Sequence, residues 1–568
     1  MLKIKEVLKN EKYYSIIIIL IASIFVCIPL MSKNIDMTYD DGIQHIARLM
    51  GTYQSIQEGQ ISIMSNFCNG FGYSWNIFYS PITALAPLIF KLLGVSFTTC
   101  IKLFIFVVIF LSGYFMYIFT KKVTNNNNVS IVAAILYIFA PYRLTDMYIR
   151  NALAELASFM FLPMIFLGLY NIFNEESNKK INLWLIIGAA GLTLTHTIIT
   201  MYTAILALIY ILINLKELKK KSIQKKLIVC TVLVLIITAF FWMPLLEHKL
   251  AAEYEVFKDG RMERAEVLVA YKLDFYRLFF TKSNDYMIYD IGLVVLIGLV
   301  LTPFAVKKVK ETKYYKLYLF MLISGVICAV MTLKIFPFEY LPKTLKMIQF
   351  SFRLLEFTSF FFAFIAAINI GIVSKKFELK EVFIVLAATM LLTCPYTSYV
   401  RTLQNFDESI LWPSVPVTEQ TGRVHAGCAS FEYLPCKAFE NRKYIENRSN
   451  QAIVLNGTAQ IENEQKNGSQ MSFDINYVLE ETQIELPYIY YLGYNVTLTV
   501  DEKIQKLKTF ETDNGFVGVQ VPILENGKID VKYTGTAIMN FSKLISIAGV
   551  CFIIFEIIYG RKHRITIN

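Results

Sequence analysis

The sequence predicts an α-helical polytopic membrane protein with about twelve transmembrane helices and a β-sandwich domain near its C-terminus. Hydrophobic residues make up 55% of the 568-residue chain, and its mean hydropathy is +0.49. Apolar runs close to the roughly 20 residues that span a bilayer recur throughout residues 1–396. Residues 397–540 are instead polar and rich in turns. Most of the chain is therefore expected in a membrane and one domain outside it.

The first apolar run, Ile16 to Leu30, follows a lysine-bearing start and precedes an acidic pair. It has no small-residue cleavage site of the kind that ends a secretory signal. We interpret it as a retained anchor, which makes residues 33–76 the first external loop.

Lysine and arginine in short loops predict the orientation, because such loops stay on the cytoplasmic side. By this rule both termini are cytoplasmic in a multi-pass protein of the cell membrane. The formal net charge of +11 then mostly reflects topology, and nucleic acid is not an expected partner. The cytoplasmic markers are Lys3 to Lys12, Lys121 and Lys122, Lys179 and Lys180, Lys216 to Lys226, Lys307 to Lys316, Lys375 to Lys380, and Arg561 to Arg564.

Apolar runs between these markers define the predicted spans. Residues 77–94 would break the alternation of sides and contain Pro81 and Pro87, so they are predicted to be re-entrant or to lie on the membrane surface. Two short runs meet at His196, which predicts broken helices near the outer face. The spans are 14–32, 97–119, 130–147, 152–173, 182–195, 198–215, 227–246, 289–306, 315–333, 352–374, 381–396 and 541–559.

The segment 397–540 carries the pattern of an external β-sandwich. Its strand-like stretches alternate or run apolar between Asn-Gly and similar turns, and they are MSFDINYV, TQIELPYIYY, NVTLTV, FVGVQVPI and KIDVKY. Cys428 and Cys436 in this domain are either a disulfide staple or two free thiols. A last helix and a basic tail, 541–568, complete the chain.

Asp40 and Asp41 form a carboxylate pair just after the first span. A carboxylate pair beside a bilayer is suited to hold a divalent cation, Mg or Mn, or to take a proton from an attacking hydroxyl. The alternative is a helix cap, because Asp before Gly-Ile-Gln-His-Ile begins many amphipathic helices.

Ionisable residues within or beside the apolar runs are further candidates, because a charge in a membrane is costly unless it faces a cavity or a partner. Arg150 and Glu155 lie at an outer hairpin, and Arg353 and Glu356 open the tenth span. Arginine grips phosphate better than lysine does, whereas snorkelling at the interface is the plain alternative. For His196 the alternative is a hydrogen-bonded structural histidine. All of them are predicted to face the side of the acidic pair, which favours a shared site.

Several of these motifs together resemble a known family. The order of Asp41 and His45, then GFGYSWNIFYSPITALAPLI, IRNALAELASF, LTHTIITMY and IQFSFRLLEF, resembles bacterial membrane proteins of the glycosyltransferase C (GT-C) superfamily. Within it the chain is most similar to the pyruvoyl-tetrahydropterin-synthase-related and YfhO-like membrane proteins. Ser351 departs from the pattern, in which proline is common. No zinc-binding histidine triad supports pterin chemistry.

The resemblance implies a GT-C-like fold and an inverting glycosyltransferase. The donor would be a sugar on polyprenyl phosphate in the membrane lipid, and the acceptor a glycan or envelope polymer on the external face. Asp40 or Asp41, with His45 beside them, would act as the base or organise the acceptor and metal. Arg353, with or without Arg150, would hold the donor phosphate.

The remaining ionisable residues, Glu155, His196 and Glu356, are then expected to line the cavity of the site. A transporter or flippase of lipid-linked glycan is an alternative, with some of the same side chains along its path. Transporters often contain internal repeats with matched broken helices, which the two halves of this chain do not show. A non-catalytic scaffold for envelope assembly is the third possibility.

Overall fold

The computed structural model describes residues 10–32, 35–36, 40–174, 181–258, 260–261, 265–282, 285–374, 376–401 and 431–565. The chain divides into two compact units, each assembled from three separate stretches of sequence. We call them the helical unit, residues 1–42, 93–235 and 263–406, and the sheet unit, residues 43–92, 236–262 and 407–568.

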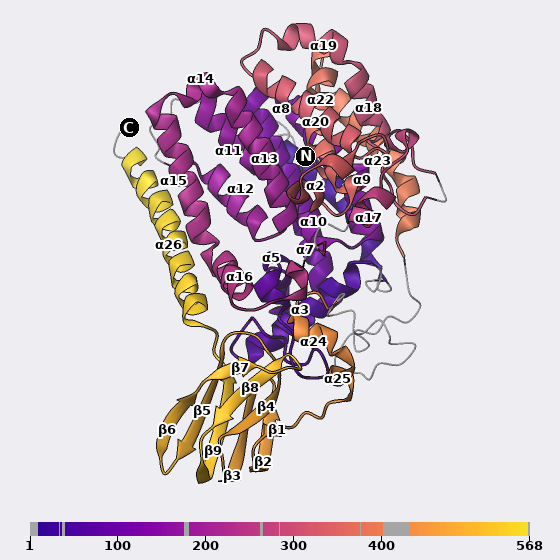
Figure 1. Cartoon of the computed structure of the whole chain (residues 1–568). Helices are drawn as coiled ribbons and strands as arrows, with labels where there is room; N and C mark the ends of the chain where they lie inside the picture. The colour runs from indigo at the N-terminus through magenta and orange to yellow at the C-terminus, as the bar shows by residue number, and fades with distance from the viewer. Residues whose placement is uncertain are drawn as a thin grey trace. The chain divides into compact units, whose positions relative to one another are not determined.

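The helical unit consists of helices, most of which are apolar (Figure 1). In chain order they are α2 (Glu11–Cys27), η1 (Ile28–Met31), α7 (Phe97–Thr124), α8 (Asn127–Ile138), α9 (Pro141–Leu144), η2 (Thr145–Ile149), α10 (Leu153–Ser158), α11 (Leu162–Asn174), α12 (Leu183–Thr193), α13 (Thr197–Ile213), α14 (Leu215–Leu218), α15 (Lys221–Ile237), α17 (Ala265–Ala270), η4 (Phe275–Leu278), α18 (Leu293–Val300), α19 (Thr302–Val309), α20 (Tyr315–Met331), η5 (Phe338–Tyr340), α21 (Lys343–Lys346), η6 (Ser351–Arg353), α22 (Leu354–Val373), α23 (Leu379–Thr393) and η7 (Cys394–Tyr399).

Helix α22 forms the centre of this unit. It packs against α8, α18, α19 and α20, and 15 of its 20 residues are buried. Gly298 of α18 lies against Ala366, and Gly325 of α20 lies against Phe362, where an added Cβ would come within 2.5 Å of its neighbour. Small residues allow such close helix packing in a membrane protein, where lipid is as apolar as the side chains. These contacts hold the middle of α22 in place within the unit.

The prediction of twelve spans is not confirmed. Among the described residues, six helices are long and apolar enough to cross a membrane, or up to eight if each bent pair is one span. The bent pairs are α8 with α9 and η2, at 42°, and α15 with α16 (Ala239–Ala251), at 69°. Predicted spans 182–195, 198–215 and 315–333 are helices of 11, 17 and 17 residues, and 289–306 is divided into two of eight. Hydropathy marks apolar composition and does not detect where a helix breaks.

The sheet unit contains the predicted β-region as two antiparallel sheets (Figure 1). One has the order β1-β4-β8-β7 and the other β2-β3-β9-β5-β6. All five predicted strands are present. The strands are β1 (Ile453–Asn456), β2 (Gln460–Asn467), β3 (Gln470–Val478), β4 (Thr482–Ile489), β5 (Tyr494–Val500), β6 (Lys503–Leu507), β7 (Thr509–Glu511), β8 (Phe516–Val521) and β9 (Leu524–Tyr533).

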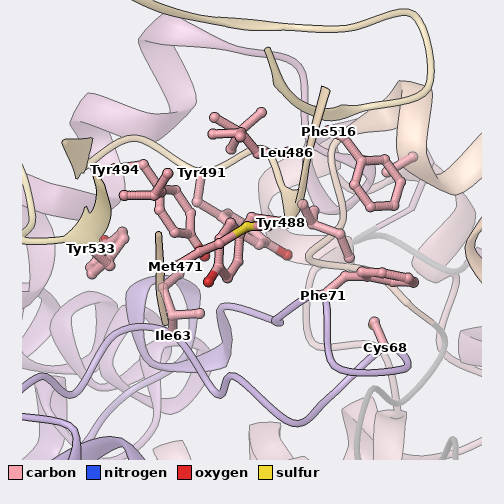
Figure 2. Packing of buried hydrophobic residues seen from close by; sticks show 14 of the residues in the cluster. Ile63, Cys68, Phe71, Met471, Leu486, Tyr488, Tyr491, Tyr494, Phe516 and Tyr533 are labelled. Atoms are coloured by element: carbon pink, nitrogen blue, oxygen red, sulfur yellow. The ribbon is translucent and has the colours of Figure 1, made fainter. Parts of the chain in front are cut away.

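Both sheets contribute to one hydrophobic core, as in a sandwich. Tyr488, Tyr491 and Tyr494 are buried in it, so these rings belong to the core (Figure 2). Residues from the predicted first loop join the same core: Phe71 packs edge to face on Phe516 at 5.2 Å between ring centroids, and Ile63 belongs to the same cluster. The first loop is therefore part of the sheet unit from residue 43 onward.

The other helices of the sheet unit are mostly short. The region 77–94 forms four-residue helices and is not among the candidate spans. Its re-entrant or surface placement stays a prediction.

Cys436 is buried, whereas Cys428 lies outside the described residues, so their pairing stays a prediction as well. The helices of the sheet unit are α3 (Gly42–Gln57), α4 (Trp75–Phe78), α5 (Ile82–Leu85), α6 (Leu88–Lys91), α16, η3 (Glu255–Phe257), α24 (Cys436–Glu440), α25 (Arg442–Asn447) and α26 (Ala537–Ile565).

The predicted orientation is testable with topology reporters. A reporter fused after Lys226 or Lys316 is expected on the cytoplasmic side, because lysine-rich loops are retained there. A reporter inserted in the strand region, after Asp501 in the exposed turn from β5 to β6, is expected on the external side. Reporter activity and protease protection in cells measure both. A cytoplasmic strand region would reverse the orientation.

Candidate functional site

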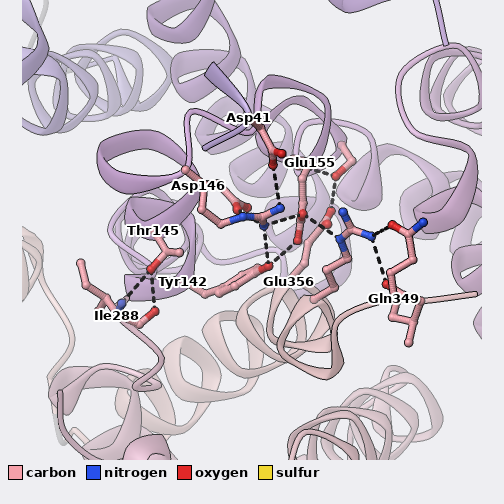
Figure 3. A network of polar contacts seen from close by, with 12 residues as sticks. Asp41, Tyr142, Thr145, Asp146, Glu155, Ile288, Gln349 and Glu356 are labelled. Atoms are coloured by element: carbon pink, nitrogen blue, oxygen red, sulfur yellow. Dashed lines mark hydrogen bonds and ion pairs between the residues drawn. The ribbon is translucent and has the colours of Figure 1, made fainter. Parts of the chain in front are cut away.

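A cluster of charged side chains is buried in the helical unit (Figure 3). It draws on the segment after α2, on η2 and α10, and on the first turn of α22. Figure 3 shows Asp41, Asp146, Glu155 and Glu356 converging on the same region, joined by hydrogen bonds and ion pairs. These residues are far apart in sequence, and the fold brings them together.

Arg150 is the centre of this cluster. Its side chain is 4% exposed, and its Nη1 donates to Asp146 Oδ1 at 2.9 Å and to Glu155 Oε2 at 2.8 Å. Its Nη2 donates to Asp41 Oδ2 at 2.9 Å. Tyr142 offers a further, longer contact at 3.4 Å. Both terminal nitrogens of Arg150 are thus occupied by carboxylates.

Glu155 joins two arginines. Its Oε2 lies 2.8 Å from Arg150 Nη1 and 3.1 Å from Arg353 Nε, and its Oε1 accepts from the hydroxyl of Tyr142. The side chain is only 1% exposed. A buried carboxylate of this kind is tolerated because two guanidinium groups and a hydroxyl replace the water it loses.

Arg353 is held by three groups but keeps one nitrogen available. Nε pairs with Glu155, and Nη1 donates to the carbonyl of Ile348 at 3.0 Å and to Gln349 Oε1 at 2.8 Å. Within the described residues its Nη2 makes no hydrogen bond. The side chain points into the unit, unlike a snorkelling arginine, and Nη2 is a donor without an acceptor in the described part of the chain.

Local backbone irregularity places these groups. Residues 145–149 form the π-helix η2, a type of turn that is common at functional sites. Thr145 anchors it through Ile288, whose N and O lie 2.9 and 2.7 Å from the Thr145 hydroxyl. Asn151 has a left-handed φ of 51°, which ends the turn before α10 carries Glu155 inward. The apolar pattern of the sequence gives no sign of this π-helix.

The acidic pair is divided between two partners. Asp41 binds Arg150 twice, because its backbone N also donates to the Arg150 carbonyl at 3.0 Å. Asp40, with a φ of 47°, accepts from the Tyr286 hydroxyl at 2.6 Å. Loss of surrounding water raises the pKa of the Asp40 carboxyl, although the residue as a whole is exposed and the Tyr286 hydrogen bond opposes the shift.

The predicted divalent metal does not fit this arrangement well. A cation shared by the pair requires both carboxylates to point toward it. The Asp41 carboxylate instead pairs with the Arg150 guanidinium, and the Asp40 carboxylate accepts a hydrogen bond from the Tyr286 hydroxyl. Across the described part of the chain, no three His, Cys, Asp or Glu side chains gather as a metal site would require. The metal stays a prediction, which titration with Mg or Mn tests.

The other predicted residues have different surroundings. His196 caps α13, with its Nδ1 accepting from Ile199 N at 3.3 Å, and it is close enough to Arg353 and Glu155 for electrostatic interaction. Glu356 accepts from Ser158, as the next charged member of the cluster. His45 belongs to the sheet unit, where its ring packs against that of Tyr79. The role of His45 beside the acidic pair therefore stays a prediction.

Sequence reasoning missed Arg143 and Asp146. Arg143 is fully buried between the rings of Tyr137 and Phe159, each 4.3 Å from its guanidinium carbon, and its three side-chain nitrogens have no hydrogen-bond partner among the described residues. Arg143 and Asp146 both lie in the predicted span 130–147. The rule that singled out Arg150, an ionisable residue in an apolar run, would have found them.

The fold and the buried charges define a multi-pass membrane protein with a polar cluster among its helices and a separate β-sheet region. Residues 78–402, more than half of the chain, match the family described as "6-pyruvoyl-tetrahydropterin synthase related domain; membrane protein". The chain belongs to this family. An "Uncharacterized protein" of Lactococcus lactis subsp. cremoris (strain MG1363) is 24% identical over 585 aligned positions, which cover 95% of this chain and 94% of the relative.

Proposed function

We propose that this membrane protein is a glycosyltransferase that moves a sugar from a polyprenyl-phosphate donor to a glycan or envelope acceptor on the external face. The observation that supports it best is the direct link between the acidic pair and the arginines. Asp41 pairs with Arg150, Arg150 with Glu155, and Glu155 with Arg353. The acidic pair that would supply the proton acceptor and the cation for phosphate are thus linked by one chain of ion pairs, which enters the pair at Asp41.

The reaction needs these two parts. The acceptor oxygen forms a bond to the anomeric carbon while the bond from that carbon to the phosphate oxygen breaks. The acceptor proton passes to a carboxylate, and polyprenyl phosphate leaves with the electron pair. Phosphate is already a good leaving group, so a base and a positive charge contribute more than a general acid would.

Asp40 is the stronger candidate for the base. Its raised pKa makes it a better proton acceptor than an ordinary aspartate, and the residue is exposed to an incoming hydroxyl. Asp41 is engaged by Arg150, so we assign it to positioning: it holds Arg150, and through Glu155 also Arg353.

Arg353 is the stronger candidate for the phosphate. Both terminal nitrogens of Arg150 are bound to carboxylates, whereas Nη2 of Arg353 keeps two N–H groups without an acceptor among the described residues. A charge-assisted hydrogen bond to a phosphate oxygen is short and roughly twice as strong as a neutral one.

We expect Arg353→Lys to weaken donor binding and Arg353→Ala to weaken it further, by about 1.5–3 kcal/mol for a charge-assisted hydrogen bond. Binding of polyprenyl phosphate to the purified protein measures this directly. Arg277→Lys is the matched control, because Arg277 lies in the same unit and pairs with Asp285 outside the cluster. Equal affinities in wild type and Arg353→Ala would remove Arg353 from the donor site.

Reconstituted vesicles distinguish an enzyme from a flippase. Polyprenyl-phosphate sugar presented on the outer face is expected to be consumed, with free polyprenyl phosphate appearing and no ion gradient required. A flippase would move intact donor between leaflets without breaking the bond from sugar to phosphate. Transport of intact donor with no release of polyprenyl phosphate, over a panel of glycan acceptors, would contradict the transferase proposal.

A further inference from the structure

An apolar groove runs along one face of α13 in the helical unit. Its volume is about 310 Å³, and four helices line it. On α13 the lining positions recur at helical spacing, so they form a single stripe. The stripe consists of Thr200, Thr203, Ala204, Ala207, Leu208 and Ile211.

The other walls are also single helix faces. Ile165 and Leu169 of α11 are buried and form the floor, and Leu185, Ala189 and Leu192 of α12 continue it. Close packing of α11 on α12 shapes this floor: a Cβ on Gly168 would come within 2.5 Å of Leu185 N. Leu227 and Thr231 of α15 complete the far wall.

The rim of the groove is open. Ala204 and Leu208 on α13, and Thr231 on α15, are exposed, whereas Thr203 and Leu192 are buried beneath them. Helices α12 and α13 are apolar, although shorter than the candidate spans, so we expect lipid hydrocarbon outside the rim. The stripe from Thr200 to Ile211 rises about 17 Å at 1.5 Å per residue, roughly half of a hydrocarbon core.

One end of the groove begins next to the charged cluster. α13 starts immediately after His196, which caps it and interacts electrostatically with Arg353 and Glu155. The hydroxyl of Thr200, the first lining residue on α13, donates to the His196 carbonyl at 2.9 Å. Further along α13, the Tyr202 hydroxyl donates to the carbonyl of Leu345, four residues before the Gln349 that binds Arg353.

We propose that this groove holds the isoprenoid chain of the lipid donor, so that its phosphate is delivered to the cluster around Arg353. The inference rests on the proposed function and adds where the lipid tail lies. A branched hydrocarbon chain matches a groove of alanine, leucine and isoleucine with a buried floor. The small side chains of Ala189, Ala204 and Ala207 keep the space open for it.

The test is chain-length selectivity of binding. Ala207→Trp puts an indole into the groove and is expected to weaken binding of undecaprenyl phosphate by about tenfold, the loss that corresponds to about two CH₂ groups no longer buried. The chain of geranyl phosphate is too short to fill the groove and loses little buried area in the variant. The affinity of Ala207→Trp for geranyl phosphate should therefore lie within about twofold of the wild-type affinity. Ala204→Phe serves as a second, milder variant should Ala207→Trp fold poorly.

Ile209→Trp is the matched control, because Ile209 is an exposed residue of α13 outside the lining set. It should leave both affinities unchanged. Equal loss for both phosphates in Ala207→Trp, or undiminished binding of undecaprenyl phosphate in both groove variants, would overturn the proposal. Displacement of undecaprenyl phosphate from wild type by equimolar phosphatidylglycerol would also overturn it, by making the groove a general phospholipid site.

Binding is measured without turnover, by native mass spectrometry of the full chain in detergent, so the two proposals fail separately. Transfer that persists in wild type while the groove variants show no selectivity contradicts the groove alone. Selective binding of the long-chain phosphate without any sugar transfer supports the groove and contradicts the transferase.

Discussion

Replacing Asp40 by asparagine is expected to reduce sugar transfer by about 10²- to 10⁴-fold, the usual contribution of a positioned general base. Asparagine keeps the size of the side chain and still accepts a hydrogen bond from Tyr286, so expression and melting behaviour should stay near wild type. The rate of sugar transfer is also expected to fall in Asp41→Asn, because Arg150 then loses the negative charge that holds it. Initial rates in reconstituted vesicles measure both.

The pH profile assigns the base. Transfer requires the deprotonated carboxylate, so the rate falls as pH decreases through the pKa of the base. Because the pKa of Asp40 is raised, this acid limb is expected at higher pH than an ordinary aspartate would give, and it should vanish from the residual activity of Asp40→Asn. A limb that persists in Asp40→Asn and disappears in Asp41→Asn would exchange the two roles.

Asp274→Asn is the matched control for both variants. Asp274 is an exposed carboxylate of the helical unit that pairs with Lys334 at 2.8 Å, outside the cluster. It should leave the rate and the pH profile unchanged. Undiminished transfer in both Asp40→Asn and Asp41→Asn would return the acidic pair to the helix-cap interpretation.

The largest effect on stability is expected for Glu155→Gln. Removing one partner of a buried ion pair costs about 3–5 kcal/mol, because the remaining charge stays buried without compensation. Here one carboxylate serves two guanidinium groups, and a glutamine NH₂ facing them would add a repulsive contact. The free energy of unfolding in mixed micelles measures the loss.

Glu339→Gln provides the comparison. Glu339 pairs with Lys272 at 3.1 Å, but its side chain is 51% exposed, so its loss should cost no more than about 1 kcal/mol. A Glu155→Gln variant as stable as Glu339→Gln would show that the cluster around Arg150 contributes little to the fold. Donor binding to folded Glu155→Gln should also weaken, because Arg353 loses its Nε partner.

Four of the five predicted strands match the observed strands to within two residues at each end, and the fifth, β9, begins four residues earlier than predicted. The stretch TQIELPYIYY contains β4, which is an almost continuously buried strand. KIDVKY forms the second half of β9, where residues that alternate between core and solvent leave a period-two pattern. The four edge strands, β1, β2, β6 and β7, were not predicted. β6, with four of its five residues exposed, shows why: an edge strand with few buried residues leaves no such pattern.

Helix continuity was less predictable than apolar composition. The run 289–306 is apolar from Ile291 onward except for Thr302, yet it divides at Leu301 into α18 and α19. Hydropathy depends on side chains alone, whereas a break depends on backbone hydrogen bonds and on neighbouring helices. For the same reason, hydropathy did not predict the π-helix η2 or the bend between α8 and α9.

The sequence by itself determined that this is a membrane protein with a β-sheet region near its C-terminus, because hydrophobic content and strand alternation are local properties of the chain. It also identified Asp41, Arg150, Glu155 and Arg353 one by one, since a charge next to an apolar run is visible without a structure. Only the tertiary structure decided that these four residues form one chain of ion pairs. It also decided that both terminal nitrogens of Arg150 bind carboxylates, whereas Nη2 of Arg353 has no acceptor among the described residues. Those facts depend on contacts between residues up to 198 positions apart, which are set by the packing of helices rather than by any local pattern.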